Sequence, residues 1–278
     1  MKLLFIGDIV AKPGRELLKR HLKALAAFLE VDLVIANGEN AAAGAGITRE
    51  NAEEIFKAGV DVITSGNHVW DRREALEFIV DVPRFIRPAN YPAGTPGAGS
   101  YVAETAGGDR VGVINVMGRV FLAAIDDPFR AAEQEIARVR EGGARIIFVD
   151  MHAETTSEKI ALSWFLDGRV TAVVGTHTHV QTADERILPG GTACLTDAGM
   201  TGPHDSIIGM EREPSLTRFL TGMPIKFEPA TGNPRLNGVL VTADDKTGRA
   251  TAVTRISYSD AELTALSKTT EPAHAHQR

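Results

Sequence analysis

The chain lacks the features that mark disulfide-rich and membrane-spanning proteins. Its 278 residues include a single cysteine, Cys194, so no disulfide can form within the chain. No apolar run approaches the roughly 18 residues that a membrane-spanning helix needs. The first ten residues, MKLLFIGDIV, are too short an apolar run for a signal peptide and show no cleavage site. We therefore expect a cytoplasmic protein that has no membrane partner.

The chain also lacks a basic surplus. Acidic residues outnumber basic ones by 36 to 30, which gives a formal net charge of −6. This balance argues against a partner such as duplex nucleic acid, whose binders normally carry a basic face. It does not exclude a small anionic substrate, because bound metal ions can reverse the local potential. The single cysteine further disfavours a thiolate metal site.

What is present is an alternation of strand-like and helix-like segments, with a hydrophobic content of 44% that is ample for a core. Strands are expected at Lys2–Ile6, Asp32–Ala36, Val60–Thr64, Ser100–Glu104, Arg110–Val116, Arg145–Val149, Val170–Val174, Asn237–Thr242 and Ala250–Ile256. Helices are expected at Arg15–Leu29, from an N-cap at Thr48 through Lys57, and at Pro128–Glu141, Ser157–Leu166 and Asp260–Lys268. Residues 181–258 read as short strands joined by turns.

This alternation predicts a layered α/β fold with helices on both faces of a sheet. The β-rich stretches suggest either a second sheet, which gives a four-layer α/β/β/α sandwich, or one mixed sheet with antiparallel additions. We expect a single domain over residues 1–268 and a disordered tail over residues 269–278.

Polar side chains able to bind metal come shortly after the ends of five of the expected strands. They are Asp8, then Glu39 with Asn40, then Asn67 with His68, then His152, and finally His177 with His179. In open α/β sheets, ligands bind outside the carboxyl ends of the strands. We therefore expect all of these side chains to meet at one edge.

The types of ligand indicate a particular chemistry. Carboxylate and amide oxygens with imidazole nitrogens suit Mn, Fe or Zn. Two ions roughly 3.5–4 Å apart can clamp the attacking and leaving oxygens of a phosphoryl transfer. Glu39, after a central strand, is the natural bridging carboxylate, and a bridging water that loses its proton would be the nucleophile. His68, beside Asn67, would then protonate the leaving oxygen.

Each residue also has an ordinary structural explanation. Asp8 alone reads as a helix cap or turn residue, Glu39 as part of a turn, and His152 as a hydrogen-bonded core histidine. His177 and His179 differ, because on an extended segment both point to the same side and form a chelating pair. The ordinary explanation would have to hold at five strand ends together, so the joint pattern favours a metal centre.

Two loops, residues 83–99 and 199–214, are expected to shape the pocket around this centre. Arg87, Arg119 and Arg212 are possible phosphate contacts.

Several blocks of the sequence resemble those of the calcineurin-like metallophosphoesterases, and most closely those of the bacterial YmdB family. The blocks are Gly7-Asp8-Ile9-Val10, Asn37-Gly38-Glu39-Asn40, Ser65-Gly66-Asn67-His68, Asp150-Met151-His152-Ala153-Glu154, residues 175–184 and residues 196–203. The resemblance extends to about residue 260.

The resemblance implies a role for each matched residue. Asp8, Asn40 and His179 would hold one metal ion, Asn67, His152 and His177 would hold the other, Glu39 would bridge them, and His68 would be the proton donor. It also implies iron or manganese as the metal and small 2′,3′-cyclic nucleotides as substrate. The wider superfamily has a histidine where this chain has Val10, and Asn40 fills that gap with an oxygen, which favours Mn or Fe(III).

The leading hypothesis is thus a dinuclear, metal-dependent phosphodiesterase acting on small cyclic nucleotides. A phosphomonoesterase or protein phosphatase would use the same metal ions and remains an alternative. A regulatory RNA- or protein-binding protein that retains the metal fold is a second alternative, although the intact ligand set favours turnover. The sequence leaves a homo-oligomer open.

Overall fold

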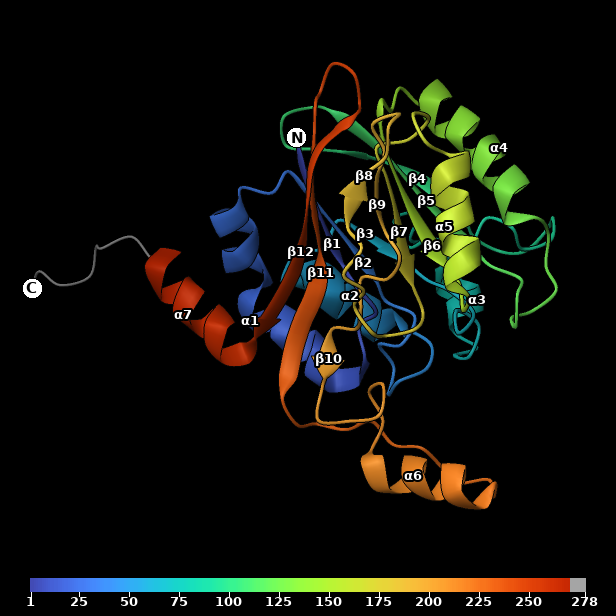
Figure 1. Cartoon of the computed structure of the whole chain (residues 1–278), viewed down its shortest axis with the longest axis vertical. Helices are drawn as coiled ribbons and strands as arrows, with labels where there is room; N and C mark the ends of the chain where they lie inside the picture. Colours follow the sequence, from blue (N-terminus) through green and yellow to red (C-terminus); the bar gives the residue numbers. More distant parts are fainter. Residues whose placement is uncertain (271–278) are drawn as a thin grey trace, which may run out of the picture.

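The computed structural model describes residues 1–270, which form two mixed β-sheets (Figure 1). The first sheet has the order β10-β11-β1-β2-β3, with β12 paired to β11, and the second has the order β4-β5-β6-β7-β9-β8. The strands of the first sheet are β1 (Lys2–Ile6), β2 (Leu33–Asn37), β3 (Val62–Thr64), β10 (Gly202–Pro203), β11 (Pro234–Ala243) and β12 (Ala250–Ser259). Those of the second are β4 (Ser100–Glu104), β5 (Arg110–Met117), β6 (Ile146–His152), β7 (Ala172–Thr176), β8 (Arg186–Ile187) and β9 (Ala193–Leu195).

Helices cover the outer face of each sheet, as Figure 1 shows. On the first sheet lie α1 (Ala11–Leu29), α2 (Arg49–Ala58), the single turn α3 (Ala75–Phe78) and α7 (Asp260–Thr270). On the second sheet lie α4 (Pro128–Glu141) and α5 (Thr156–Phe165). The result is a four-layer α/β/β/α sandwich, which confirms that prediction over a single mixed sheet.

The side chains of β1 show why the sequence forms these layers. Leu3 and Phe5 belong to the hydrophobic cluster between the sheets, whereas Leu4 and Ile6 belong to the cluster beneath the helices. Successive side chains of a strand point to opposite faces, so a strand covered on both faces is apolar throughout. Phe5 also packs against Phe148 of the second sheet, with ring centroids 4.9 Å apart. This shared core holds the two sheets, and therefore their strand ends, in one fixed arrangement.

The strand directions place the predicted ligands together. Strands β1, β2 and β3 run parallel to one another, and so do β5, β6, β7 and β9. Strand β1 is central, because it pairs with β2 on one side and antiparallel with β11 on the other, where Lys2 lies opposite Thr242.

Several elements differ from the prediction: α1 begins at Ala11 instead of Arg15, and the single turn α3 was not expected. Residues 181–258 contain a helix, α6 (Arg212–Thr221), in place of strands alone. Only Ser215 of this helix is buried, so no apolar stripe facing a core announces it in the sequence. Strand β6 continues through His152 instead of ending at Val149, so His152 is a strand residue.

The helices of the described part are short. The longest, α1, has 19 residues, and among residues 1–270 no helix combines the length and apolar character that crossing a bilayer requires. Of the predicted tail at 269–278, residues 271–278 lie outside the described part.

A buried ion pair joins α5 to the segment after β9. Lys159 Nζ donates to Asp197 Oδ2 at 2.7 Å, and the two side chains are 2% and 0% exposed. The same oxygen accepts from the Thr178 amide at 3.2 Å and from its hydroxyl at 2.6 Å. The other oxygen accepts from the Gly199 amide at 2.8 Å. Asp197 therefore fixes the loop that follows β7 to the body of the protein.

Replacing Lys159 with methionine is expected to lower the free energy of unfolding by about 3 kcal/mol, because Asp197 then lacks its buried cation. Lys19→Met is the matched control, since Lys19 is 62% exposed and surface changes are usually worth less than about 0.5 kcal/mol. Urea denaturation of the metal-free proteins, followed by circular dichroism, measures both. A Lys159→Met loss no larger than the control's would contradict this role.

Candidate metal centre

The two sheets bring all seven predicted ligands to one edge, at the carboxyl ends of their parallel strands. The first sheet supplies the oxygen ligands Asp8, Glu39, Asn40 and Asn67, and the second supplies the nitrogen ligands His152, His177 and His179. Asp8, Glu39, Asn40 and His152 are each no more than 3% exposed. The expectation that these residues meet at one edge is therefore confirmed as geometry.

One half of the cluster is centred on His152. Its Nε2 lies 2.9 Å from Asn67 Oδ1, 3.1 Å from Glu39 Oε1 and 3.1 Å from His177 Nδ1. Ligand atoms of Glu39, His152 and His177 all lie within 4.8 Å of one another. This spacing lets one ion reach all of them.

The other half contains Asp8, Asn40 and His179. His179 Nε2 lies 3.9 Å from Asp8 Oδ1. Asn40 Nδ2 donates to the Gly44 carbonyl at 3.1 Å, which fixes the amide and leaves its Oδ1 without a partner. Glu39 Oε1 lies 3.1 Å from His152 Nε2, and Glu39 directly precedes Asn40 in the chain, so this residue links the two halves.

Three buried ligand oxygens lack a hydrogen bond: Asp8 Oδ1, Asn40 Oδ1 and Glu39 Oε1, which has only the ion pair with His152 Nε2 at 3.1 Å. Buried polar atoms are nearly always satisfied, and each one left unsatisfied costs about 1–3 kcal/mol, or more for a charged group. Acceptors gathered beside imidazole nitrogens, without a spare donor, are what a cation satisfies. The donor set, which has no thiolate, fits Mn, Fe or Zn. The residues present therefore fit the predicted metal ions.

The ionisation of these groups is coupled. Burial alone would raise the pKa of the Glu39 carboxyl, but His152 lowers that pKa to about 2. Burial would likewise lower the pKa of the His152 imidazole, but Glu39 raises it to about 9. Burial raises the pKa of Asp8. Without metal, Glu39 and His152 thus form a charged pair. A cation that binds to both side chains must displace the proton of His152.

The His152 ring is held from behind by a buried hydroxyl and carboxylate. Its Nδ1 lies 2.9 Å from Thr176 Oγ1, which donates to Asp150 Oδ1 at 2.7 Å. Asp150 also accepts from the Thr64 hydroxyl and from Asn37 Nδ2, and burial raises its pKa to about 6. These hydrogen bonds fix the His152 ring with its Nε2 toward the cluster.

The other two imidazoles are oriented in the same way. His177 Nε2 lies 2.8 Å from Glu154 Oε2, and His179 Nδ1 lies 2.8 Å from the Ile208 carbonyl oxygen. In a neutral imidazole, the nitrogen that faces an acceptor carries the N–H. The other nitrogen then has a free lone pair. The free nitrogens, Nδ1 of His177 and Nε2 of His179, are those that face the cluster.

The conformation around these two histidines differs from the prediction of an extended segment. Strand β7 ends at Thr176, and His177 and His179 have φ values of 101° and 64°. Positive φ is unusual for non-glycine residues and persists where the surroundings enforce it. Asp197 enforces it by binding Thr178 between them. The two side chains consequently lie in different halves of the cluster, whereas an extended segment would place them on the same side.

Gly66 allows the close packing of the ligands. A Cβ at this position would lie 2.2 Å from a ring carbon of His152 and 2.4 Å from Glu39 Oε2. Any side chain here would displace two of the ligands.

His68 lies at the border of the cluster. Its amide donates to Glu39 Oε2 at 3.0 Å, and its Nδ1 lies 2.8 Å from Asp71 Oδ2. The side chain is 35% exposed, so the ring is accessible while its Nδ1 is occupied. His68 therefore lines the cavity beside the cluster with its ring accessible.

The three arginines expected at the phosphate have other positions. The Arg87 guanidinium donates to backbone carbonyls of residues 88–96, and Arg119 pairs with Asp127 at 3.0 Å. Arg212 is the first residue of α6. None of the three lines the cavity over the ligands.

A cavity of about 550 Å³ opens over the ligand cluster. One side is polar and is lined by Glu39, Asn40, His68, Glu154, His177 and His179. The other side is apolar and is lined by Ile207, Ile208, Met210, Phe219 and Phe227. The volume is within the range of small-molecule sites.

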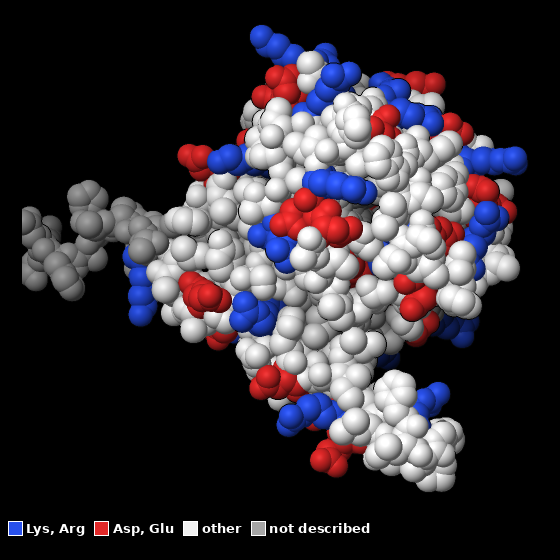
Figure 2. Space-filling view, in the orientation of Figure 1, with Lys and Arg blue, Asp and Glu red and all other residues white. Residues whose placement is uncertain are grey.

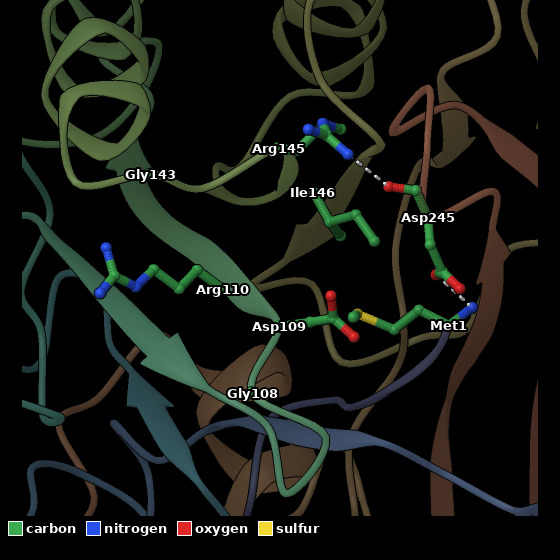
Figure 3. A pocket seen from close by; sticks show the side chains of 8 residues that line it. All are labelled: Met1, Gly108, Asp109, Arg110, Gly143, Arg145, Ile146 and Asp245. Carbon is green, nitrogen blue, oxygen red and sulfur yellow. Dashed lines mark hydrogen bonds and ion pairs between the residues drawn. The ribbon is translucent and has the colours of Figure 1, made fainter.

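Another cavity, of about 350 Å³, lies at the opposite ends of the strands (Figure 3). It is lined by residues at the starts of β1, β5 and β6, among them Met1, Arg110 and Ile146. It contains none of the predicted ligands, and ligands of α/β sheets bind at the carboxyl ends. The cavity over the cluster is therefore the candidate functional site.

Sequence reasoning missed the residues that hold the ligands from behind, chiefly Asp197, Lys159 and Thr176. A signal for Asp197 was present, because it follows the short apolar strand β9 just as the ligands follow theirs. The other two carry no pattern of their own.

Comparisons with known proteins identify the family of the chain. The chain matches the YmdB-like protein family over residues 4–256. It is 50% identical to the 2′,3′-cyclic-nucleotide 2′-phosphodiesterase of Bacillus subtilis (strain 168), over 94% of this chain and 98% of that one.

Solved structures agree as well. A hypothetical protein from Thermus thermophilus superposes with a TM-score of 0.86 at 44% identity, covering 93% of this chain and 99% of that one. A 5′-nucleotidase precursor from the same organism, at 15% identity and a TM-score of 0.55 over 97% of this chain and 58% of that one, shares the fold alone. That likeness confirms the predicted metallophosphoesterase-type fold. With the family matched across most of its length, the chain belongs to the YmdB-like protein family.

Proposed function

We propose that the chain is a metal-dependent phosphodiesterase that hydrolyses 2′,3′-cyclic nucleotides. The observation that carries the proposal is the set of three buried oxygens that lack hydrogen bonds and lie among three oriented histidines. The cavity over this cluster has room for a nucleotide. The name of the Bacillus subtilis relative supports this substrate class.

The geometry supports one assignment of the ligands. Asp8, Asn40 and His179 would hold one ion, Asn67, His152 and His177 would hold the other, and Glu39 would be shared between them. Two such ions place positive charge on the phosphate and supply a water whose pKa is near 7. The oxygen-rich half favours Mn or Fe(III) over softer ions, so we propose iron or manganese.

Hydrolysis of the cyclic diester forms one bond from phosphorus to the water oxygen and breaks one bond to a ribose oxygen. The leaving alkoxide is strongly basic and needs a proton as it departs. His68 supplies this proton from Nε2, while Asp71 holds Nδ1 and so fixes the ring. A phosphate monoester of an alcohol also releases an alkoxide, so a proton donor is equally compatible with a phosphomonoesterase or protein phosphatase that uses the same ions. The name of the Bacillus subtilis relative is what favours the diesterase.

Purified protein is expected to contain about two metal ions per chain and to open the ring of 2′,3′-cyclic AMP. A chelator should stop the reaction and added Mn²⁺ should restore it, because the ligands alone leave the phosphate charge unbalanced. Elemental analysis and chromatography of the product measure the two quantities. Metal without ring opening would redirect the proposal to a phosphomonoesterase, and neither metal nor activity would favour a binding protein.

Asp8→Asn tests the cation requirement without an activity assay. At about 100 times Kd, Mn²⁺ should add about 2.7 kcal/mol to the stability of the wild-type protein and much less to that of the variant. The metal-free variant should be at least as stable as the metal-free wild type, because an amide buries no charge. Thermal denaturation with and without Mn²⁺ measures this, with the 67% exposed Asp81 changed to Asn as control. Equal stabilisation of Asp8→Asn and wild type would refute the assignment.

His68→Ala is expected to keep its metal ions and to lose a factor of about 10² to 10⁴ in kcat on 2′,3′-cyclic AMP. The loss should be much smaller on a p-nitrophenyl diester, whose phenolate departs without a proton. Asp71→Asn keeps the imidazole but orients it less well. Its rate on 2′,3′-cyclic AMP should therefore lie between those of the wild type and His68→Ala. Cleavage of 2′,3′-cyclic AMP by His68→Ala at the wild-type rate would show that His68 is not the donor.

A further inference from the structure

The apolar side of the cavity is built by one projecting segment, residues 207–229, which we call the arm. Figure 1 shows its helix, α6, standing away from both sheets, and Figure 2 shows that its surface is mostly uncharged on that side. Phe219 is 81% exposed and Phe227 is 42% exposed, yet both line the cavity over the ligand cluster. Exposed aromatic rings beside a polar cluster mark a surface that contacts a ligand.

The arm is attached directly to the proposed metal ligands. The Ile208 carbonyl oxygen lies 2.8 Å from His179 Nδ1. Met210 packs so closely on Gly44 that a Cβ there would lie 2.5 Å from the Met210 methyl carbon, and Gly44 has a φ of +90°. Gly44 in turn accepts from Asn40. The base of the apolar wall is therefore held at a fixed place relative to His179 and Asn40.

The arm side of the cavity offers contact surface in place of hydrogen bonds. Among the described lining residues of the arm, Ser215 is the only one with a polar side chain, and its hydroxyl donates to the Glu211 carbonyl at 2.8 Å. The Phe227 ring is covered by the Arg218 guanidinium, which lies 5.5 Å from its centroid. A ligand group bound here would have to be flat and apolar on its face.

We propose that Phe219 and Phe227 form the nucleobase subsite of the cavity, with the base against the rings and the phosphate at the ligand cluster. The inference rests on the proposed function, because it requires a nucleotide substrate. Stacking accepts every base, since each one has a π-face, and it favours the larger rings. The enzyme should therefore accept 2′,3′-cyclic AMP and GMP with similar KM and bind the cyclic pyrimidine nucleotides more weakly.

Steady-state kinetics of Phe219→Ala and Phe227→Ala tests the subsite with two substrates. These are 2′,3′-cyclic AMP and the 2,3-cyclic phosphate of methyl riboside, which has the same reacting atoms and no base. Each variant should raise KM for 2′,3′-cyclic AMP about tenfold or more, as expected for the loss of one stacking contact. On the substrate without a base, kcat/KM should stay within about twofold of the wild type.

Leu220→Ala is the matched control, because Leu220 lies on the same helix, is 84% exposed and does not line the cavity. It should leave both substrates unaffected. An unchanged KM for 2′,3′-cyclic AMP in both phenylalanine variants would overturn the subsite. Equal losses on both substrates would also overturn it, and light scattering would then show whether the arm joins two copies of the chain. If the wild type hydrolyses neither substrate, the proposed function itself fails.

Discussion

Three buried oxygens that lack hydrogen bonds, on Asp8, Glu39 and Asn40, are the constraint on which the rest of the site depends. Packing two apolar sheets together places these groups where water cannot reach them, and burial raises the pKa of Asp8 as a result. In the absence of a cation, the Glu39–His152 pair offsets only part of this unfavourable burial. The fold thus carries a local destabilisation that a bound cation removes, and the same destabilisation makes the site bind cations.

The surrounding residues serve to keep that arrangement from relaxing. Without support, His177 and His179 would leave the left-handed region, and the His152 ring would be free to rotate. Asp197, held by Lys159, prevents the first, and the hydrogen bonds of Thr176 and Asp150 prevent the ring of His152 from turning. Rigid support of this kind lowers the cost of reorganisation when charge develops in the substrate.

The sequence predicts well where these polar side chains lie, because its signal is simple. Asp8, Glu39 and Asn67 each follow an apolar strand, and the topology of α/β sheets brings such positions together whatever the details. It predicts less well where a local conformation depends on contacts between loops that are distant in the sequence. The conformation of His177 and His179 depends on Asp197, which reaches them from a different strand end. Helix α6 was missed because it buries only Ser215, so the amphipathic pattern that reveals a helix is absent.

The central place of β1 has a consequence for the order of events during synthesis. Lys2 of β1 pairs with Thr242 of β11, whereas every predicted metal ligand lies between Asp8 and His179. All the ligands thus leave the ribosome before the strand that completes the first sheet, and pairing of such distant strands is intrinsically slow. The strand order therefore leaves one edge of β1 without its partner until β11 has been made.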